Sequence, residues 1–479
     1  MKIPKIAQNS AIYIVFNVLQ KTINFFLLPL YTIYLTPEDY GITNVLVSVS
    51  ALLTFLLTFS VQAASARFHF RYSKDEGVVK RLWGTNIIFI LVNSFFWIVL
   101  LCIFYDYSLI YLIGNEISFY PYALLGILNC CFSPIYLYFQ TYLQTTQRAK
   151  YYVINNLAFF LFQLFFTILF VANFKWGATG VILAQLIVNF IFSIYALLSL
   201  RRFIIYTFSL KLLRKSLSYS IPLTPHMLSG WLNGMLDKLF INRIVDLASV
   251  GLYSISYQFG MIINMLGLGV NQAFTPWFFK NHDHEEGRRL IVLMSDLTIM
   301  GLCIISFGCA LFSQEILTIM TSETYHSIWP SIIVLVFANL FDTYYYFYVS
   351  VLFLDKTKVL SFISITCSVV TCLINIALIS LYGYIGAAYS YFIVQLVKSI
   401  FVRYYANKYR SDINFHSILH YTEALVAIIV TLISLSILPN ITLSGFILKV
   451  LIFTIFVIFY MFVNKTSILF VVERYIKNK

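Results

Sequence analysis

Long apolar runs dominate this sequence and restrict what it can fold into. Stretches of about 20 residues that are almost free of charge recur along all 479 residues, and each is long enough to cross the ~30 Å hydrocarbon core of a bilayer as an α-helix. Only 11% of the residues are charged, whereas a soluble domain carries roughly 25%. Because backbone polar groups inside a bilayer must be paired within the chain, such runs predict helices. The sequence therefore predicts an all-α integral membrane protein.

Fourteen membrane-spanning helices are predicted. Their approximate ranges are 11–35, 41–66, 84–105, 119–143, 152–173, 177–200, 216–242, 250–275, 290–313, 328–353, 359–382, 384–402, 418–438 and 445–464. The N-terminal MKIPK and the apolar run after it are similar to a signal peptide, but the run is too long and no small-residue cleavage site follows it. We expect this first run to be retained as a helix.

Basic residues gather in alternate loops between the predicted spans. The net charge is +13, yet the loops between the basic ones hold mainly acidic residues such as Glu38, Asp106 and Glu315. This is the positive-inside pattern, and it predicts that both termini lie in the cytoplasm. The basic charge is thereby explained by topology, so no nucleic-acid partner is expected.

The chain contains a weak internal repeat. An offset of 210 residues pairs Gly41 with Gly251 and Asn129 with Asn339. The same offset pairs Tyr136 with Tyr346, and after a short gap Gly177 meets Gly383. Six spans per repeat place both repeats in the membrane in the same orientation, with a central cavity between two bundles. We predict six-helix lobes at 1–205 and 206–412 and two further helices within 413–479.

Polar stripes interrupt the helices that open each repeat. Asn17, Lys21 and Asn24 are spaced i, i+4 and i+7, which places them on one helical face. A lysine at the bilayer centre costs at least ~3 kcal/mol on insertion scales, so Lys21 should face protein or a water-filled cavity. The seventh span carries a matching stripe of His226, Gly230, Asn233 and Asp237. The stripes predict that substrate is bound by Asn17, Lys21, Asn24, His226 and Asn233.

The fourth and tenth spans carry further polar residues, which indicate more of the cavity wall. Tyr136 and Tyr346 are predicted to contact substrate, and the carboxylates of Asp342 and Asp237 to carry a coupling proton or sodium ion. Each residue also has a structural alternative. Polar side chains in membrane helices often make interhelical hydrogen bonds worth only ~0.6 kcal/mol. Lys21 and Asp342 fit structural ion pairs, and Asp237 fits an interfacial pair with its neighbour Lys238.

No pattern in the sequence predicts an enzyme. All seven cysteines lie inside predicted spans without metal-ligand spacing, which is typical of small packing residues. The HDHEE stretch at 282–286 lies in a predicted loop without further ligands. There is no glycine-rich phosphate loop and no Ser/His/Asp arrangement, so neither a cofactor nor a metal ion is expected.

Two segments resemble a known family. LPLYTIYLTPEDYGITNV (28–45) resembles the first span and loop of the Wzx-type oligosaccharide-lipid flippases, which belong to the multidrug/oligosaccharidyl-lipid/polysaccharide exporter superfamily. Residues 219–259 resemble the same family through Pro222, Asp237 and the A-x-V-G-x-Y segment from Ala248 to Tyr253. The resemblance covers the whole chain, including the final pair of helices.

The resemblance implies a flippase of the bacterial cytoplasmic membrane. Such a protein moves polyprenyl-diphosphate-linked oligosaccharide from the inner to the outer leaflet by alternating access, driven by an ion or by the membrane potential. Lys21 would then attract the diphosphate, and Asp342 or Asp237 would carry H⁺ or Na⁺. Polymerase and chain-length proteins of a glycan assembly complex would be its partners. The motifs do not distinguish O-antigen, capsule, exopolysaccharide or teichuronic-type glycans.

Three alternatives remain open. Lipid II flippases usually carry several arginines in and just after the first span, whereas this chain has QKTINFFLLP there. Drug and metabolite exporters of the superfamily lack the final two helices. A non-transporting scaffold in a glycan assembly complex would need no buried charge, so replacing Lys21 and Asp342 should leave it working.

Overall fold

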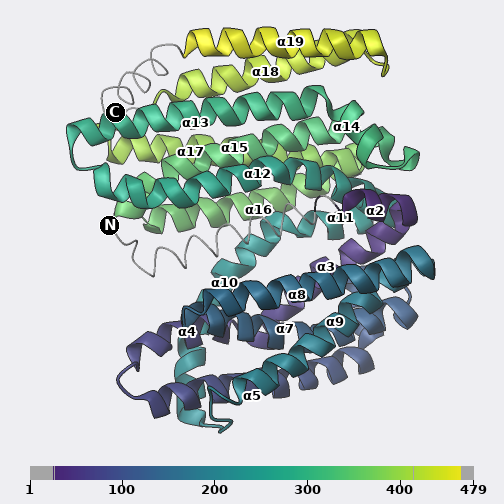
Figure 1. The fold of residues 1–479 in the computed structure, drawn as a ribbon, viewed down its shortest axis with the longest axis vertical. Coiled ribbons are helices and arrows are strands. Elements are labelled where there is room, and N and C mark those ends of the chain that lie inside the picture. Colours follow the sequence, from purple (N-terminus) through teal and green to yellow (C-terminus); the bar gives the residue numbers. More distant parts are fainter. Residues whose placement is uncertain (1–24, 26, 356, 414, 465–479) are drawn as a thin grey trace. The chain divides into compact units, whose positions relative to one another are not determined.

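The computed structural model describes residue 25 and residues 27–355, 357–413 and 415–464. These residues form helices joined by short loops, and no β-strand occurs in the ranges just given (Figure 1). Eleven of the described helices are long and apolar enough to cross a membrane. The prediction of an all-α membrane fold is confirmed.

Two of the predicted spans are more polar than these eleven. The seventh corresponds to α10 (Leu210–Gly234) with α11 (Leu236–Ile244), and the eighth to α12 (Leu247–Asn281). These helices are not among the eleven that pass the length and hydropathy test. The first predicted span lies largely outside the described residues.

The contacts divide the chain into two compact units, which are described separately. Unit 1 contains the described residues of Leu30–Ser254, and unit 2 contains those of Lys21–Pro29 and Ile255–Lys479. The helices α10 and α11 belong to unit 1, and α12 continues from one unit into the other. The lobe boundaries predicted from the repeat remain predictions.

Unit 1 is built around α7 (Leu124–Thr145), which packs on α3, α5, α8 and α9. Buried aromatic residues fill this core, and the Tyr138 hydroxyl donates to the Trp83 carbonyl oxygen at 3.0 Å. The other elements are α2 (Leu28–Tyr34), α3 (Pro37–Thr58), α4 (Val61–Arg71), α5 (Glu76–Ile103), η1 (Tyr105–Tyr107), α6 (Ile110–Ile113), η2 (Phe119–Ala123), α8 (Ala149–Thr167), η3 (Ile168–Asn173) and α9 (Gly177–Leu200).

The LTPEDYG motif forms the start of α3. The Thr36 hydroxyl accepts a hydrogen bond from the Asp39 amide at 3.1 Å, and the Asp39 carboxylate accepts one from the Thr36 amide at 3.3 Å. This reciprocal capping, with Pro37 in the first turn, satisfies amide groups that a helix start leaves unpaired. The Asp39 carboxylate also accepts from the Ala178 amide at 3.0 Å. The motif therefore ties the start of α3 to the start of α9.

Two glycines make a reciprocal close contact between α3 and α12. A Cβ atom on Gly41 would lie 1.9 Å from the Leu247 carbonyl oxygen, and one on Gly251 would lie 1.9 Å from the Pro37 carbonyl oxygen. The offset that pairs Gly41 with Gly251 also pairs Pro37 with Leu247. Gly41 therefore contacts the residue that corresponds to Pro37 in the second repeat, and Gly251, which corresponds to Gly41, contacts Pro37 itself. Two copies of a motif that are related by a two-fold axis make reciprocal contacts of this kind. The contact therefore agrees with the internal repeat.

Unit 2 is built around α15 (Trp329–Asp355), which packs on α13, α16 and α17. In the apolar window of α15 83% of the residues are buried, against 17% in α19, so α15 is a core helix and α19 a peripheral one. The other elements of unit 2 that follow α12 are α13 (Glu285–Leu311), α14 (Ser313–Met320), η4 (Glu323–Ile328), α16 (Thr357–Tyr382), α17 (Tyr384–Tyr409), α18 (Ser417–Ile437) and α19 (Leu443–Val463).

The last two helices pack on α13, and polar contacts join them to α13 and α14 (Figure 1 shows the helices). The buried His420 ring lies 2.7 Å from the Asp296 carboxylate, and the Lys449 ammonium lies 2.6 Å from Glu315. A charge in a membrane helix is tolerated when a partner in the protein neutralises it. These contacts attach α18 and α19 to the body of unit 2.

Candidate functional site

A charged pair lies in the core of unit 2. Asp342 is in the middle of α15 and Lys398 is in α17, and the lysine Nζ lies 2.8 Å from the aspartate Oδ1. Their side chains are only 10% and 19% exposed. An isolated charge in this environment is costly, and in this pair each charge has an opposite charge beside it.

The carboxylate of Asp342 has partners on two helices. Asn264 of α12 donates its amide to Asp342 Oδ2 at 2.8 Å, and the Tyr346 hydroxyl, one turn further along α15, lies 3.4 Å from the same atom. Asn264 also lies 3.3 Å from the Tyr346 hydroxyl. Both carboxylate oxygens are therefore engaged, one by the lysine and one by neutral donors.

The ammonium group of Lys398 has two further neighbours. It donates to Gln395 Oε1 at 3.2 Å and lies 4.2 Å from the centroid of the Tyr345 ring. The negative face of an aromatic ring attracts a cation at such a distance. Neutral polar and aromatic side chains thus surround the ammonium of Lys398 and the carboxylate of Asp342 and hold both charges in position.

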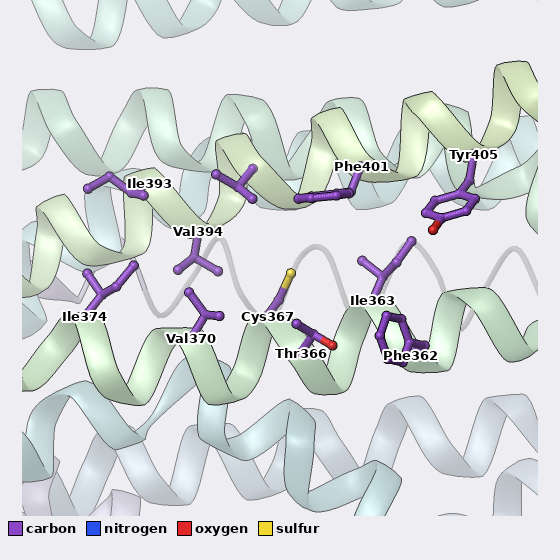
Figure 2. Close-up of a pocket in the computed structure, with 11 residues that line it drawn as sticks. Phe362, Ile363, Thr366, Cys367, Val370, Ile374, Ile393, Val394, Phe401 and Tyr405 are labelled. Atoms are coloured by element: carbon purple, nitrogen blue, oxygen red, sulfur yellow. The ribbon is translucent and has the colours of Figure 1, made fainter.

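An apolar groove runs beside this pair between α16 and α17 (Figure 2). It has a volume of about 210 Å³, and its walls include Val370 and Cys367 of α16 and Val394 and Phe401 of α17. Lys398 is one turn after Val394, and its ammonium interacts electrostatically with the Cys367 side chain. The groove can therefore hold a hydrocarbon chain next to the charged site.

Five of the predicted site residues cannot be placed. Asn17, Lys21 and Asn24 lie outside the described residues. His226 and Asn233 are on α10, but their side chains are also outside the described part of the structure. Their predicted roles remain predictions.

Tyr136 lies in the packed core of unit 1. Its ring stacks on Phe159 with 4.8 Å between centroids and meets the edge of Phe192 at 5.3 Å. The side chain is buried at 7% exposure. We therefore leave Tyr136 out of the site proposed below.

Asp237 and Lys238 in α11 are both buried but have different partners. Asp237 accepts a hydrogen bond from the Tyr253 hydroxyl at 2.7 Å, whereas Lys238 donates to Asn44 Oδ1 at 2.9 Å. These contacts link α11 to α12 and α3 within unit 1. A role of Asp237 in ion coupling remains a prediction.

The sequence analysis did not identify Lys398 or Asn264. A signal for Lys398 is present, because Tyr391, Gln395 and Lys398 are spaced i, i+4 and i+7 on an apolar helix. This is the spacing that drew attention to Lys21. Asn264 also has a signal, because Asn264, Asn271 and Thr275 are spaced i, i+7 and i+11 on α12.

A second polar region lies outside the spans, after α17. The Arg410 guanidinium donates to both carboxylate oxygens of Asp412 at 2.8 and 2.9 Å. These hydrogen bonds lower the pKa of Asp412 below its ordinary value of 3.8. The carboxylate therefore stays ionised at neutral pH.

Among the described residues no group of His, Cys, Asp and Glu side chains could hold a metal ion.

Comparison with known proteins identifies the family and the fold. A family profile described as "Polysaccharide biosynthesis protein" matches residues 6–282. The chain is 23% identical over 299 residues to "Lsg locus putative protein 1" of Haemophilus influenzae. That alignment covers 58% of this chain and 66% of the relative, so it spans just under two thirds of the relative's length.

Two solved structures are similar over most of the chain. "Lipid II flippase MurJ, inward closed conformation" matches with a TM-score of 0.73 and 14% identity over 95% of this chain and 100% of that one. An inward-facing multidrug resistance MATE family transporter of the MOP superfamily matches with a TM-score of 0.62 and 13% identity, over 82% and 95%. At such identities the likeness shows the fold alone, which is that of these membrane transporters. Since the profile matches more than half of its residues, the chain belongs to the polysaccharide biosynthesis protein family.

Proposed function

We propose that this protein is a flippase that moves polyprenyl-diphosphate-linked oligosaccharide across the bacterial cytoplasmic membrane by alternating access. Its family supports a role in polysaccharide biosynthesis. The observation that carries the proposal is the buried pair of Asp342 and Lys398, because ionisable groups inside membrane helices usually mark substrate or ion pathways.

The pair suggests how binding of an ion and binding of the substrate are coupled. When a proton binds Asp342, the carboxylate loses its charge and Lys398 loses its counter-ion. The freed ammonium then pairs with an oxygen of the incoming diphosphate. Release of the proton on the other side restores the ion pair and expels the diphosphate. Moving one charge through the membrane potential is worth ~2.3 kcal/mol per 100 mV, so the potential can drive the cycle.

The groove between α16 and α17 suits the other end of such a substrate. A prenyl tail is apolar and flexible, and the groove wall is almost entirely hydrocarbon (Figure 2). Its place beside Lys398 would let the tail lie in the groove while the diphosphate lies at the ammonium.

The substrate-binding residues predicted on the repeat-opening helices remain part of the proposal as predictions. Lys21 with Asn17 and Asn24, and His226 with Asn233, would bind the diphosphate and the sugars. The orientation that the charge pattern predicts places the termini in the cytoplasm, where the substrate is made. Polymerase and chain-length proteins would receive the exported units.

The experiment uses a strain that lacks the gene and carries either the wild-type gene or the Lys398→Gln variant. Surface polysaccharide is measured together with the lipid-linked oligosaccharide retained on the cytoplasmic leaflet. We expect the deletion and Lys398→Gln to accumulate the retained intermediate at normal protein levels. Lys408→Gln is the matched control, because Lys408 is an exposed lysine on the same helix. Lys21→Ala tests the predicted residue of the first span.

Other results would replace this function. A deletion that retains no lipid-linked glycan but changes drug tolerance would favour a cation-coupled exporter. Accumulation of the peptidoglycan precursor instead would favour a lipid II-type flippase. If deletion retains the intermediate and Lys398→Gln does not, the function stands and the assignment of the ion pair fails.

A further inference from the structure

A basic cavity lies at the ends of α7, α8 and α9 in unit 1. It has a volume of about 370 Å³, and its charged lining residues are Arg148, which precedes α8, and Arg202, which follows α9. Among the residues that the structure describes, no carboxylate lines it. The charge pattern of the loops predicts that these helix ends face the cytoplasm. The cavity is therefore positive and lies where a membrane helix leaves the hydrocarbon core.

Among the described residues the two guanidinium groups have no acceptor, and Arg148 is held by an aromatic ring. Arg148 is half-buried and stacks on the Phe203 ring at 3.8 Å from its centroid, which leaves the N–H groups at its edge unobstructed. Within the described ranges neither guanidinium makes a hydrogen bond or an ion pair. Glu76, which interacts with the neighbouring Tyr142, is itself paired with Lys80 at 3.4 Å. A guanidinium carries five donors, so this arrangement leaves a place for an anion.

The surroundings of the cavity favour an amphiphile over a free ion. Leu198 and Tyr151 line it and are 56% and 62% exposed. The spanning window that contains α8 is only 22% buried, so this helix has a broad apolar face. A phosphate held by the arginines would therefore have hydrocarbon surface directly beside it. Arginine binds phosphate through paired charge-assisted hydrogen bonds, and basic pockets between membrane helices on the cytoplasmic side hold anionic headgroups.

We propose that this cavity binds the phosphate headgroup of an anionic phospholipid, with the acyl chains along the exposed faces of α8 and α9. The site is in unit 1, apart from the ion pair of unit 2, and it holds whether or not the transport function proposed above is correct. Inorganic phosphate shares the headgroup chemistry but lacks the acyl chains.

The test measures how lipids raise the thermal midpoint of the purified full-length protein in detergent. The probes are dioctanoyl phosphatidylglycerol, the zwitterionic dioctanoyl phosphatidylcholine, and inorganic phosphate. We expect stabilisation by phosphatidylglycerol alone, with an apparent affinity about tenfold weaker in Arg148→Gln and in Arg202→Gln. Arg201→Gln is the matched control, because it removes the same charge next to Arg202 but does not line the cavity.

Each other result would overturn the proposal. If Arg201→Gln and Arg202→Gln weakened the affinity for phosphatidylglycerol equally, the lipid would be attracted only by the overall positive charge of this surface. Stabilisation by inorganic phosphate to the same extent would make the ligand a free anion. If wild type and variants had the same apparent affinity for phosphatidylglycerol, the cavity would not be the site where its headgroup binds. Arg202 is exposed, so its substitution tests the site even if Arg148→Gln fails to fold.

Discussion

The same pair of helices is held together differently in the two repeats. The offset that pairs Asn129 with Asn339 places Phe132 opposite Asp342, and the one that pairs Gly177 with Gly383 places Phe192 opposite Lys398. In unit 1, α7 and α9 meet through aromatic rings, with Phe132 5.1 Å from Phe190 and Phe192 5.3 Å from Tyr136. In unit 2 the corresponding positions of α15 and α17 form a salt bridge, although the rings of Phe341 and Phe392 also join these helices with 5.5 Å between centroids.

This difference separates a packing role from a functional one. In unit 1, aromatic contacts and the 2.9 Å hydrogen bond from Asn189 to Asn129 join α7 and α9 without a buried charge. A buried ion pair seldom stabilises a protein more than apolar residues of similar size would. Stability therefore gives little reason for the charges in unit 2, whereas transport gives one. The predictions that follow test this contrast, beginning with the largest expected effect.

Removing one charge of the pair should have the largest effect. Asp342→Leu or Lys398→Met alone leaves an unpaired buried charge and should lower the free energy of unfolding by about 3–5 kcal/mol. The double variant should recover most of this loss, because it copies the apolar arrangement of unit 1, but should still fail in transport. Thermal midpoints in detergent and the retained lipid-linked oligosaccharide give the two readouts. A double variant as unstable as the singles would show that the two charges are not coupled.

The hydrogen bonds to the two buried carboxylates should differ in strength. Tyr253→Phe removes a 2.7 Å bond to Asp237 and should cost about 1.5–3 kcal/mol, the usual range for a bond to a charged group. Tyr346→Phe removes a contact of 3.4 Å to Asp342, which is long for an O–H donor, and should cost less than about 1 kcal/mol. Thermal denaturation of both variants checks the order, and the reverse order would mean that Tyr346 is a principal support of the ion pair.

The two repeat-related glycines should be equally intolerant of a side chain. Gly41→Ala and Gly251→Ala each bring a methyl group against a carbonyl oxygen and should destabilise the protein by about 1–3 kcal/mol. Gly301→Ala in α13 is the control. A Cβ there meets nothing within 4 Å, so the substitution should be neutral or stabilising by up to about 1 kcal/mol. Thermal midpoints that fell for only one of the two glycines would contradict the two-fold contact.

The exposed pair of Arg410 and Asp412 should contribute least. Because Arg410 lowers the pKa of Asp412, the ionised carboxylate stabilises the folded protein above pH 3.8, and this contribution is lost as the pH falls through the lowered pKa. Asp412→Asn should therefore cost about 0.2–1 kcal/mol at neutral pH and nothing in strong acid. Thermal midpoints of wild type and variant across the acid range measure this. A difference that grew on acidification would refute the assignment.

Much of the fold follows from the sequence because the bilayer limits the possible structures. Long apolar runs predicted the helices. In the tenth span the spacing places Asp342 and Tyr346 one turn apart, and on α15 the tyrosine hydroxyl lies 3.4 Å from the carboxylate. Tyr136, taken from the same kind of stripe, packs against Phe159 and Phe192, and its contact with substrate stays a prediction. A tyrosine ring fits an aromatic core as well as a cavity wall, so spacing alone does not decide between them.

The partners of the charged site could not be predicted. Lys398 meets Asp342 across 56 residues of sequence, and Asn264 reaches the same carboxylate from a third helix. A single sequence gives the face on which a residue lies, but not which face of another helix packs against it. That choice depends on how the helices pack together. A lysine in an apolar run nevertheless predicts that a carboxylate lies nearby, and Asp342 was the available candidate in the tenth span.

The contact between Gly41 and Leu247 bears on how the protein is made. The start of α3 emerges from the ribosome early, but the helix end against which it packs is synthesised only after the whole first repeat. Unit 1 therefore cannot close until the chain has been made through Ser254. If the gene were divided after residue 205, the first fragment would lack α10, α11 and the start of α12. That fragment would therefore lack part of the surface against which the start of α3 packs, so unit 1 should not form from it alone.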